Sequence, residues 1–154
     1  MRKMLGLLLL PIAVASCGGS SGSAASNTPT TSSTTAVIAV VSKSVKGQTE
    51  DVLTDTNAQT LYYLTSDKAA TPACAGQCLN NWPPLVLASG DPGSGASLPG
   101  KLTIATTPNG RVVLYNGHPL YRFVRDKTSN DANGEGINAF GGTWHVATPS
   151  LAAS

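Results

Sequence analysis

The stretch that decides the fold is Lys101–Val124, which reads KLTIATTPNGRVVLYNGHPLYRFV. Three apolar, β-branched and aromatic runs alternate here with two turn signals, at Pro108–Gly110 and at Asn116–Gly117. Asn-Gly between apolar runs favours a tight hairpin, because both turn positions take positive φ. The stretch therefore predicts a three-stranded antiparallel meander. The strands are expected over 102–105, 111–115 and 120–124.

The end of this stretch belongs to an internal repeat. Residues 116–127 read NGHPLYRFVRDK and residues 57–68 read NAQTLYYLTSDK, with Asn, Leu, Tyr, Asp and Lys identical in the two copies. Each copy is followed by a tryptophan, Trp82 after the first and Trp144 after the second. Matches in the same order without gaps indicate a duplication. Convergence of two ordinary hairpins is the alternative.

The flanking segments fit a mainly β domain. Ala36–Val41 and Leu61–Leu64 favour strands. Only Ala75–Trp82 suggests a short helical turn, which Pro83 and Pro84 would end. The Gly- and Pro-rich segment Gly90–Gly100 predicts a loop between the repeats. We expect a single small antiparallel β domain built from two related repeats, with a short helical turn near the Cys-x3-Cys segment. Its expected bounds are 36–147, with repeats at about 49–87 and 101–147 and a tail at 148–154.

The side chains shared by the two copies have a physical interpretation. They are Tyr62, Asp67 and Trp82 in the first copy, and Tyr121, Phe123, Asp126 and Trp144 in the second. In an extended strand the tyrosine and the residue two places later point to one face. The aspartate is placed to bind turn backbone, and the tryptophan is expected to pack across the aromatic face. We interpret this set as scaffold, with a ligand site as the alternative.

The pattern Tyr-x-aromatic-x-x-Asp at 121–126, with the Cys74–Cys78, Trp82–Leu85 and Gly141–Trp144 segments, resembles a bacterial lipoprotein family. That family is called the secreted repeat of unknown function, and the resemblance covers about 49–147. It implies an extracytoplasmic location and a tandem repeat, without an established activity. The first copy departs from the pattern, because Leu64 stands where the family prefers an aromatic residue. The departure counts against a ligand platform built from aromatic side chains of both repeats.

The N-terminus predicts export and a lipid anchor. Arg2 and Lys3 precede an apolar stretch that ends at Val14 and is shorter than the roughly 20 residues a membrane span needs. Residues 14–17, Val-Ala-Ser-Cys, resemble a lipobox. In proteins with that motif the cysteine, here Cys17, receives diacylglycerol on sulfur and usually an acyl chain such as palmitate on its amino group. An ordinary signal peptide with an incidental cysteine is the alternative.

These features predict where the protein resides. We expect a lipoprotein signal peptide at 1–16, and a lipidated Cys17 that begins a Ser/Thr-rich tether over 17–35. Two or three acyl chains would hold the protein on the lipid, its membrane partner. The expected location is the cell membrane or the outer membrane, lipid-anchored and facing the extracytoplasmic side.

Two further cysteines, Cys74 and Cys78, are expected to close a disulfide, because export exposes them to an oxidising compartment. The alternative is a copper or redox accessory protein that uses Cys74, Cys78 and a histidine, His118 or His145, since thiolates and imidazoles suit Cu(I). Residues 131–136 begin like a Ca²⁺ loop but have Gly142 where the bidentate glutamate is needed. We therefore expect no resident cofactor, with copper as the alternative.

Charge and motifs exclude several classes of function. The formal net charge of the 154 residues is +2, and it comes from Arg2 and Lys3 within the signal peptide. A nucleic-acid partner is therefore not expected. Ser94 lies in Gly93-Ser94-Gly95, which is not a Gly-x-Ser-x-Gly nucleophile elbow, and no phosphate-binding glycine loop or paired-carboxylate signature is found. We expect a binding or structural role at the cell envelope and no enzymatic activity; the partner, an envelope protein or a small ligand, is left open.

Overall fold

The computed structural model describes residues 33–68 and 71–154. The predicted signal peptide, the predicted acylation site Cys17 and most of the predicted tether lie outside the described residues. The strands and the helix are β1 (Thr34–Val45), β2 (Gln48–Thr54), β3 (Tyr62–Leu64), α1 (Gln77–Asn81), β4 (Asp91–Ser94), β5 (Leu102–Thr107), β6 (Gly110–Tyr115), β7 (His118–Pro119), β8 (Asn138–Ala139) and β9 (Gly142–Val146). The domain is mainly β, as the sequence predicts.

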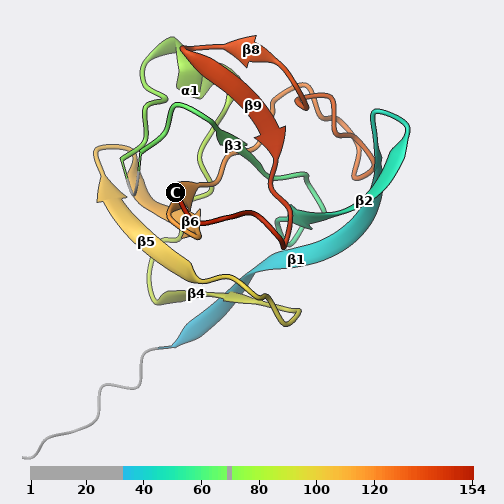
Figure 1. The fold of residues 1–154 in the computed structure, drawn as a ribbon. Coiled ribbons are helices and arrows are strands. Elements are labelled where there is room, and N and C mark those ends of the chain that lie inside the picture. Colours follow the sequence, from blue (N-terminus) through green and yellow to red (C-terminus); the bar gives the residue numbers. More distant parts are fainter. Residues whose placement is uncertain (1–32, 69–70) are drawn as a thin grey trace, which may run out of the picture. The chain divides into compact units, whose positions relative to one another are not determined.

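The strands form three small sheets of three strands each, with the orders β2-β1-β4, β3-β9-β8 and β5-β6-β7. All pairs are antiparallel except β1 with β4, which is parallel. Figure 1 shows β3 and β9 running between the β1–β2 hairpin and the β5–β6 hairpin. The sheet of β3 and β9 joins the repeats directly, because β3 belongs to the first copy and β9 to the second.

The predicted meander over 101–124 forms, but its third strand is shorter than expected and begins earlier, at His118–Pro119. The backbone of Tyr121 leaves this sheet for the first repeat: its N–H donates to Tyr62 O at 2.9 Å, and the N–H of Tyr62 donates back to Tyr121 O at 2.8 Å. Local strand propensity could not reveal this partner, which lies 59 residues away.

The predicted loop over 90–100 is partly wrong, because Asp91–Ser94 forms β4 beside the first half of β1. Its composition of Asp, Pro, Gly and Ser carries no strand signal, and pairing with an open strand edge decides its conformation. Gly93 permits the close approach, since a Cβ there would lie 2.7 Å from Thr34 Cγ2. The predicted helical turn is confirmed as α1, whose only buried residue is Cys78.

Each repeat contributes its last segment to the hydrogen bonds of the other. In the first repeat Leu61 N–H donates to Leu53 O, and both residues also bond Ala147 of the second repeat. The three bonds close a ring: Leu53 N–H donates to Ala147 O at 2.7 Å, and Ala147 N–H donates to Leu61 O at 2.8 Å.

The second repeat forms the equivalent ring with a segment of the first. Leu120 N–H donates to Val113 O at 3.0 Å, Val113 N–H to Leu85 O at 2.8 Å, and Leu85 N–H to Leu120 O at 2.8 Å. The two rings match residue by residue, so the duplication inferred from sequence extends to the backbone contacts. The repeats are interlocked, and neither contains all the strand partners it needs.

Candidate functional site

The aromatic motif residues lie in the core that the two repeats share. The indole rings of Trp82 and Trp144 stack with centroids 3.8 Å apart and planes 2° apart. Phe123 stacks on Trp82 at 4.2 Å, and Tyr62 meets Trp82 edge-on at 5.4 Å. All of these side chains are buried, Phe123 being the most exposed at 5%. The motif therefore builds the core and offers no exposed aromatic platform.

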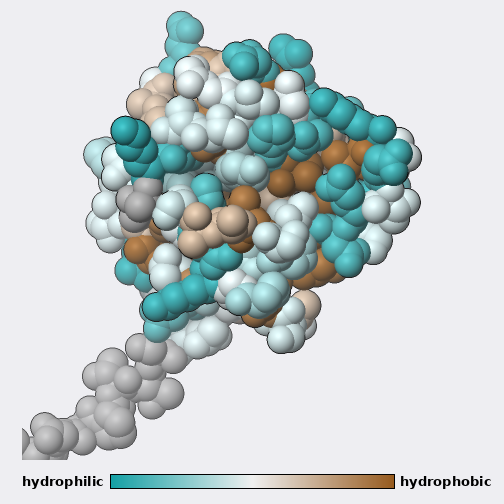
Figure 2. All heavy atoms as spheres, viewed as in Figure 1, coloured by the Kyte–Doolittle hydropathy of each residue, from teal (hydrophilic) through white to brown (hydrophobic). Residues whose placement is uncertain are grey.

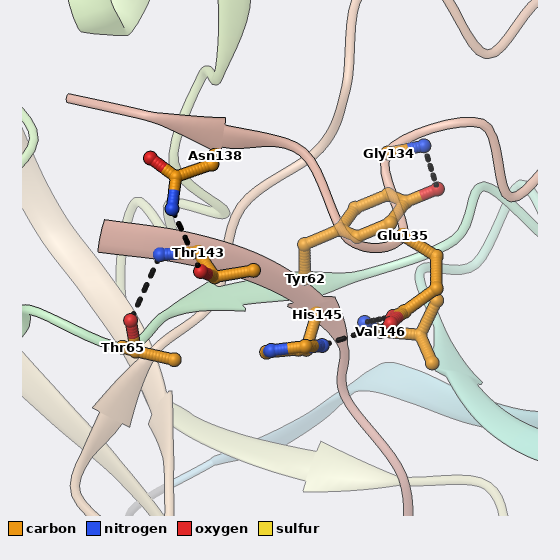
Figure 3. Close-up of polar contacts among 8 residues, drawn as sticks. All are labelled: Tyr62, Thr65, Gly134, Glu135, Asn138, Thr143, His145 and Val146. Atoms are coloured by element: carbon orange, nitrogen blue, oxygen red, sulfur yellow. Dashed lines mark hydrogen bonds and ion pairs between the residues drawn. The ribbon is translucent and has the colours of Figure 1, made fainter. Parts of the chain in front are cut away.

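The tyrosine of the first motif bonds the aspartate of the second. Tyr62 O–H donates to Asp126 Oδ2 at 2.7 Å, and Asp126 Oδ1 accepts from Asn133 N–H at 3.0 Å. Figure 3 shows the same hydroxyl accepting from Gly134 N–H, at 3.2 Å. Burial and then the bond to Asp126 raise the pKa of Tyr62. The prediction that the aspartate binds turn backbone is confirmed for Asp126. The hydrogen bond from Tyr62 of the opposite repeat gives Asp126 a second role.

The reciprocal pair, Tyr121 and Asp67, lacks the well-aligned hydrogen bond of the first pair. Asp67 Oδ1 accepts from Ala73 N–H at 2.6 Å. Among the described residues, neither Tyr121 O–H nor Asp67 Oδ2 has a hydrogen-bond partner of ordinary geometry. The two groups are nevertheless neighbours, since burial first and then the Asp67 charge raise the pKa of Tyr121. Burial also raises the pKa of Asp67.

The predicted disulfide between Cys74 and Cys78 is confirmed, with Cα atoms 5.3 Å apart and both residues buried. The histidines of the copper alternative have other contacts: His118 Nε2 lies 3.2 Å from Ala152 O, and His145 pairs with Glu135. Within 33–68 and 71–154, no three His, Cys, Asp or Glu side chains are grouped so that they could hold a metal ion. The structure therefore gives the copper alternative no support.

The segment that begins like a Ca²⁺ loop uses its carboxylates for other purposes. Asp131 Oδ2 accepts from the backbone N–H groups of Lys127 and Thr128, at 2.6 and 2.8 Å. Glu135 bonds β9 instead. The two carboxylates therefore serve separate parts of the loop, which is a turn between the motif aspartate and Trp144.

One cluster of polar side chains is open to solvent, and it centres on His145 of β9. His145 Nδ1–H donates to Glu135 Oε1 at 2.8 Å, and Val146 N–H donates to Glu135 Oε2 at 2.8 Å, as Figure 3 shows. Thr143 N–H donates to Thr65 Oγ1 at 2.9 Å and holds the start of the same strand. Because Nδ1 faces the carboxylate, the other ring nitrogen of His145, Nε2, is the one left for a ligand.

An open groove of about 360 Å³ lies beside this pair. It is lined by Val45, Lys46, Gln48, Glu50, Tyr63, Glu135, His145, Val146, Thr148 and Leu151. On the face drawn in Figure 2, hydrophobic atoms gather where the β1–β2 hairpin approaches β9, among largely hydrophilic surroundings. We call this the His145 groove. The sequence predicts a surface or structural role for His145, with copper binding as the alternative, and no local pattern links it to Lys46, Tyr63 or Glu135.

The pseudo-symmetric position holds a different groove. It lies between the tip of the β5–β6 hairpin and the disulfide loop, with a volume of about 470 Å³. Its lining is uncharged: Thr71, Pro72, Cys74, Ala75, Gly76, Leu79, Thr106, Thr107, Pro108 and Asn109. Pro83 follows Trp82 as His145 follows Trp144. Ala73 and Asn133 bind the motif aspartates through their backbone N–H groups, and aligning these two residues places Ala75 at the position of Glu135. The His–Glu pair is therefore absent from the first repeat.

A second charged cluster lies inside the domain. Lys43 is 4% exposed, and its ammonium donates to Ala58 O and to Thr60 Oγ1, both at 2.8 Å. Burial lowers the pKa of Lys43, and the negative charges of nearby aspartates oppose that effect. Asp55 forms an ion pair with Arg122 of the other repeat at 2.6 Å. These groups are satisfied within the protein, so we assign them to the scaffold.

Two segments of the chain, residues 43–86 and 103–148, match the family described as a secreted repeat of unknown function. The chain therefore belongs to this family, as its resemblance suggested, and the family description supports an extracytoplasmic location. No curated protein and no solved structure matches the chain. In the part of the chain that the structure describes, no helix is long and apolar enough to cross a membrane.

Proposed function

We propose that this member of the family is a lipoprotein of the cell envelope, anchored through Cys17 and displayed on the extracytoplasmic side. The lipobox-like residues 14–17 and the Ser/Thr-rich segment after them support an anchor followed by a tether. The family description supports export. The disulfide is in keeping with an oxidising compartment.

The proposed role of the domain is to bind a ligand in the His145 groove, without catalysis. One observation carries this proposal: the charged side chains of that groove have no counterparts in the matching groove of the other repeat. The two repeats share the scaffold contacts, so the fold itself does not require a His–Glu pair at this place. Residues that a scaffold does not need, gathered in a concave surface, are typical of a binding site.

Cell fractionation tests the anchor. Cys17→Ala removes the acylated sulfur and should move the protein from the membrane pellet to the soluble extracytoplasmic fraction. Ser16→Ala is the matched control, because it keeps a small residue before the cysteine and should leave the protein in the pellet. Continued pelleting of the Cys17→Ala protein would contradict the anchor.

Ligand screening tests the binding role separately. The exported Cys17→Ala protein keeps the whole domain and can be followed by NMR against amino acids, short peptides, sugars, nucleotides and organic acids. We expect at least one of these classes to shift the signals of His145 and Val146, and His145→Gln to weaken that response. If no class shifts these signals, the binding role is wrong and a structural role replaces it.

A further inference from the structure

The His145 groove contains hydrogen-bonding groups that the fold leaves available: two donors, Lys46 and Tyr63, and the acceptor nitrogen of His145. Lys46 Nζ, His145 Nε2 and the Tyr63 hydroxyl make no hydrogen bond with any residue in the described ranges 33–68 and 71–154. All three residues line the groove. By contrast, the buried Lys43 and Tyr62 bind protein acceptors. The available groups come from three segments: the β1–β2 turn, β3 and β9.

Backbone geometry brings the Lys46 ammonium to the loop that carries Glu135. Lys46 and Gly47 both have positive φ, 47° and 83°, so they form a tight turn that projects from the hairpin. At the other side, a Cβ on Gly136 would collide with Lys46 Nζ. The absence of a side chain at residue 136 therefore lets the ammonium approach the backbone next to Glu135.

Both oxygens of Glu135 bind groups of β9. One accepts from His145 Nδ1–H and the other from Val146 N–H. Its role is to fix the imidazole so that Nε2 is the free nitrogen. Glu50 on β2 is the other acid of the groove, and its carboxylate makes no hydrogen bond or ion pair within the described residues.

The groove thus combines two donors, Lys46 and Tyr63, with the free carboxylate of Glu50. We propose that it binds a small zwitterion, an α-amino acid or the end of a short peptide. The ligand carboxylate is bound by Lys46 and the Tyr63 hydroxyl, and the ligand ammonium is bound by Glu50, with His145 Nε2 as a further acceptor. The volume of about 360 Å³ is at the lower end of the range for ligand sites, which suits a ligand of this size.

This inference deepens the proposed binding role and rests on it. The test compares three probes by NMR titration and calorimetry with the exported Cys17→Ala protein: alanylalanine, N-acetylalanine and alaninamide. Alanylalanine carries both charges, and each of the other probes carries one. We expect alanylalanine to bind at least about tenfold more tightly than either, the effect of one charge-assisted hydrogen bond.

Variants assign the two ends of the ligand. Lys46→Met should weaken binding of alanylalanine about tenfold, whereas Glu50→Gln should weaken alanylalanine but leave N-acetylalanine unchanged or tighter. Lys101→Met is the matched control, since Lys101 is exposed and outside the groove, and it should change none of these affinities.

Two outcomes would overturn the proposal that the ligand is a zwitterion. If N-acetylalanine binds as tightly as alanylalanine and Glu50→Gln has no effect on either, the ligand is an anion. If none of the three probes shifts His145 but a sugar or nucleotide of the wider screen does, the ligand class is wrong while the binding role stands. If no compound in the whole screen shifts the His145 signals, the proposed binding role itself is contradicted.

Discussion

The two repeats share a skeleton and differ in the loops that connect the motif aspartate to the tryptophan. In the first repeat this loop contains α1 and the Cys74–Cys78 disulfide. In the second it contains Glu135 and four glycines, and it is tied to β9 by the Glu135 carboxylate. One loop is closed covalently and borders an uncharged groove, whereas the other borders a groove with charged side chains.

This difference shows that the most recognisable residues are not the functional candidates. The motif tyrosines, aspartates and tryptophans are buried and hold the repeats together. The candidate site is formed where the repeats diverge, because a duplicated scaffold can change a loop without losing its core.

Separating the repeats should abolish folding. Residues 33–100 and 101–154 each lack strand partners that the other supplies, including Ala147 for the first and Leu85 for the second. Each fragment alone should show no cooperative thermal unfolding by circular dichroism. Mixing the two at equal concentration should restore a cooperative transition. A fragment that folds alone as a monomer would show that the repeats are independent domains.

Removing the disulfide should destabilise the domain by about 2–5 kcal/mol, the range typical of small secreted domains. The change is Cys74→Ser with Cys78→Ser, and urea unfolding of the exported Cys17→Ala protein measures it. The response of His145 to ligand should persist below the unfolding transition, because the disulfide borders the other groove. Loss of ligand binding in the folded variant would contradict the assignment of separate roles to the two loops.

The two motif tyrosines should respond differently to loss of the hydroxyl. Tyr62→Phe leaves buried Asp126 Oδ2 without its donor and should cost about 1.5–3 kcal/mol, the value of a hydrogen bond to a charged group. Tyr121→Phe removes a hydroxyl that has no well-aligned partner among the described residues, so its cost should be smaller. Urea unfolding measures both, and equal losses would mean that the reciprocal pairs are equivalent in solution.

The smallest expected effect is a change in how the free energy of unfolding depends on pH, and it comes from Asp67. Burial raises the pKa of Asp67 in the folded state above its unfolded value of 3.8, so the folded protein binds the proton more tightly. This contribution to stability is complete below the unfolded pKa and is lost as pH rises through the folded pKa.

Asp67→Asn should therefore gain stability relative to the parent protein between pH 4 and neutral pH, and the difference should shrink towards pH 3. Urea unfolding at several pH values measures the difference. Asp126→Asn is the matched control; it weakens the bond from Tyr62 and should lose stability at neutral pH. A pH-independent difference for Asp67→Asn would show that burial does not control this carboxyl group.

The strand-forming runs, the turns and the disulfide could be predicted from the sequence, because each depends on residues close together in the chain. The duplication could be predicted because its two copies keep identical residues in the same order. The Asn116–Gly117 turn has the positive φ values that its residues favour, 50° and 88°. The short spacing of Cys74 and Cys78 made their disulfide predictable in the same way. The turn preference of asparagine and glycine, and the pairing of closely spaced cysteines, depend on only a few neighbouring residues.

The partners across the repeats could not be predicted from the sequence. Tyr62 and Asp126 are 64 residues apart, and nothing local indicates that each motif tyrosine faces the opposite aspartate. The same holds for β4, which is a strand only because the edge of β1 is open to it.

The local turns, the strand-forming runs, the repeat and the expected export of the chain can all be inferred from the order of the residues. The tertiary structure decided that the repeats exchange their last segments and that Lys46, Tyr63 and His145 share one groove. The physical reason is that backbone hydrogen bonds and charged side chains take their partners from whichever segment the core brings near. The shape of that core depends on both repeats at once.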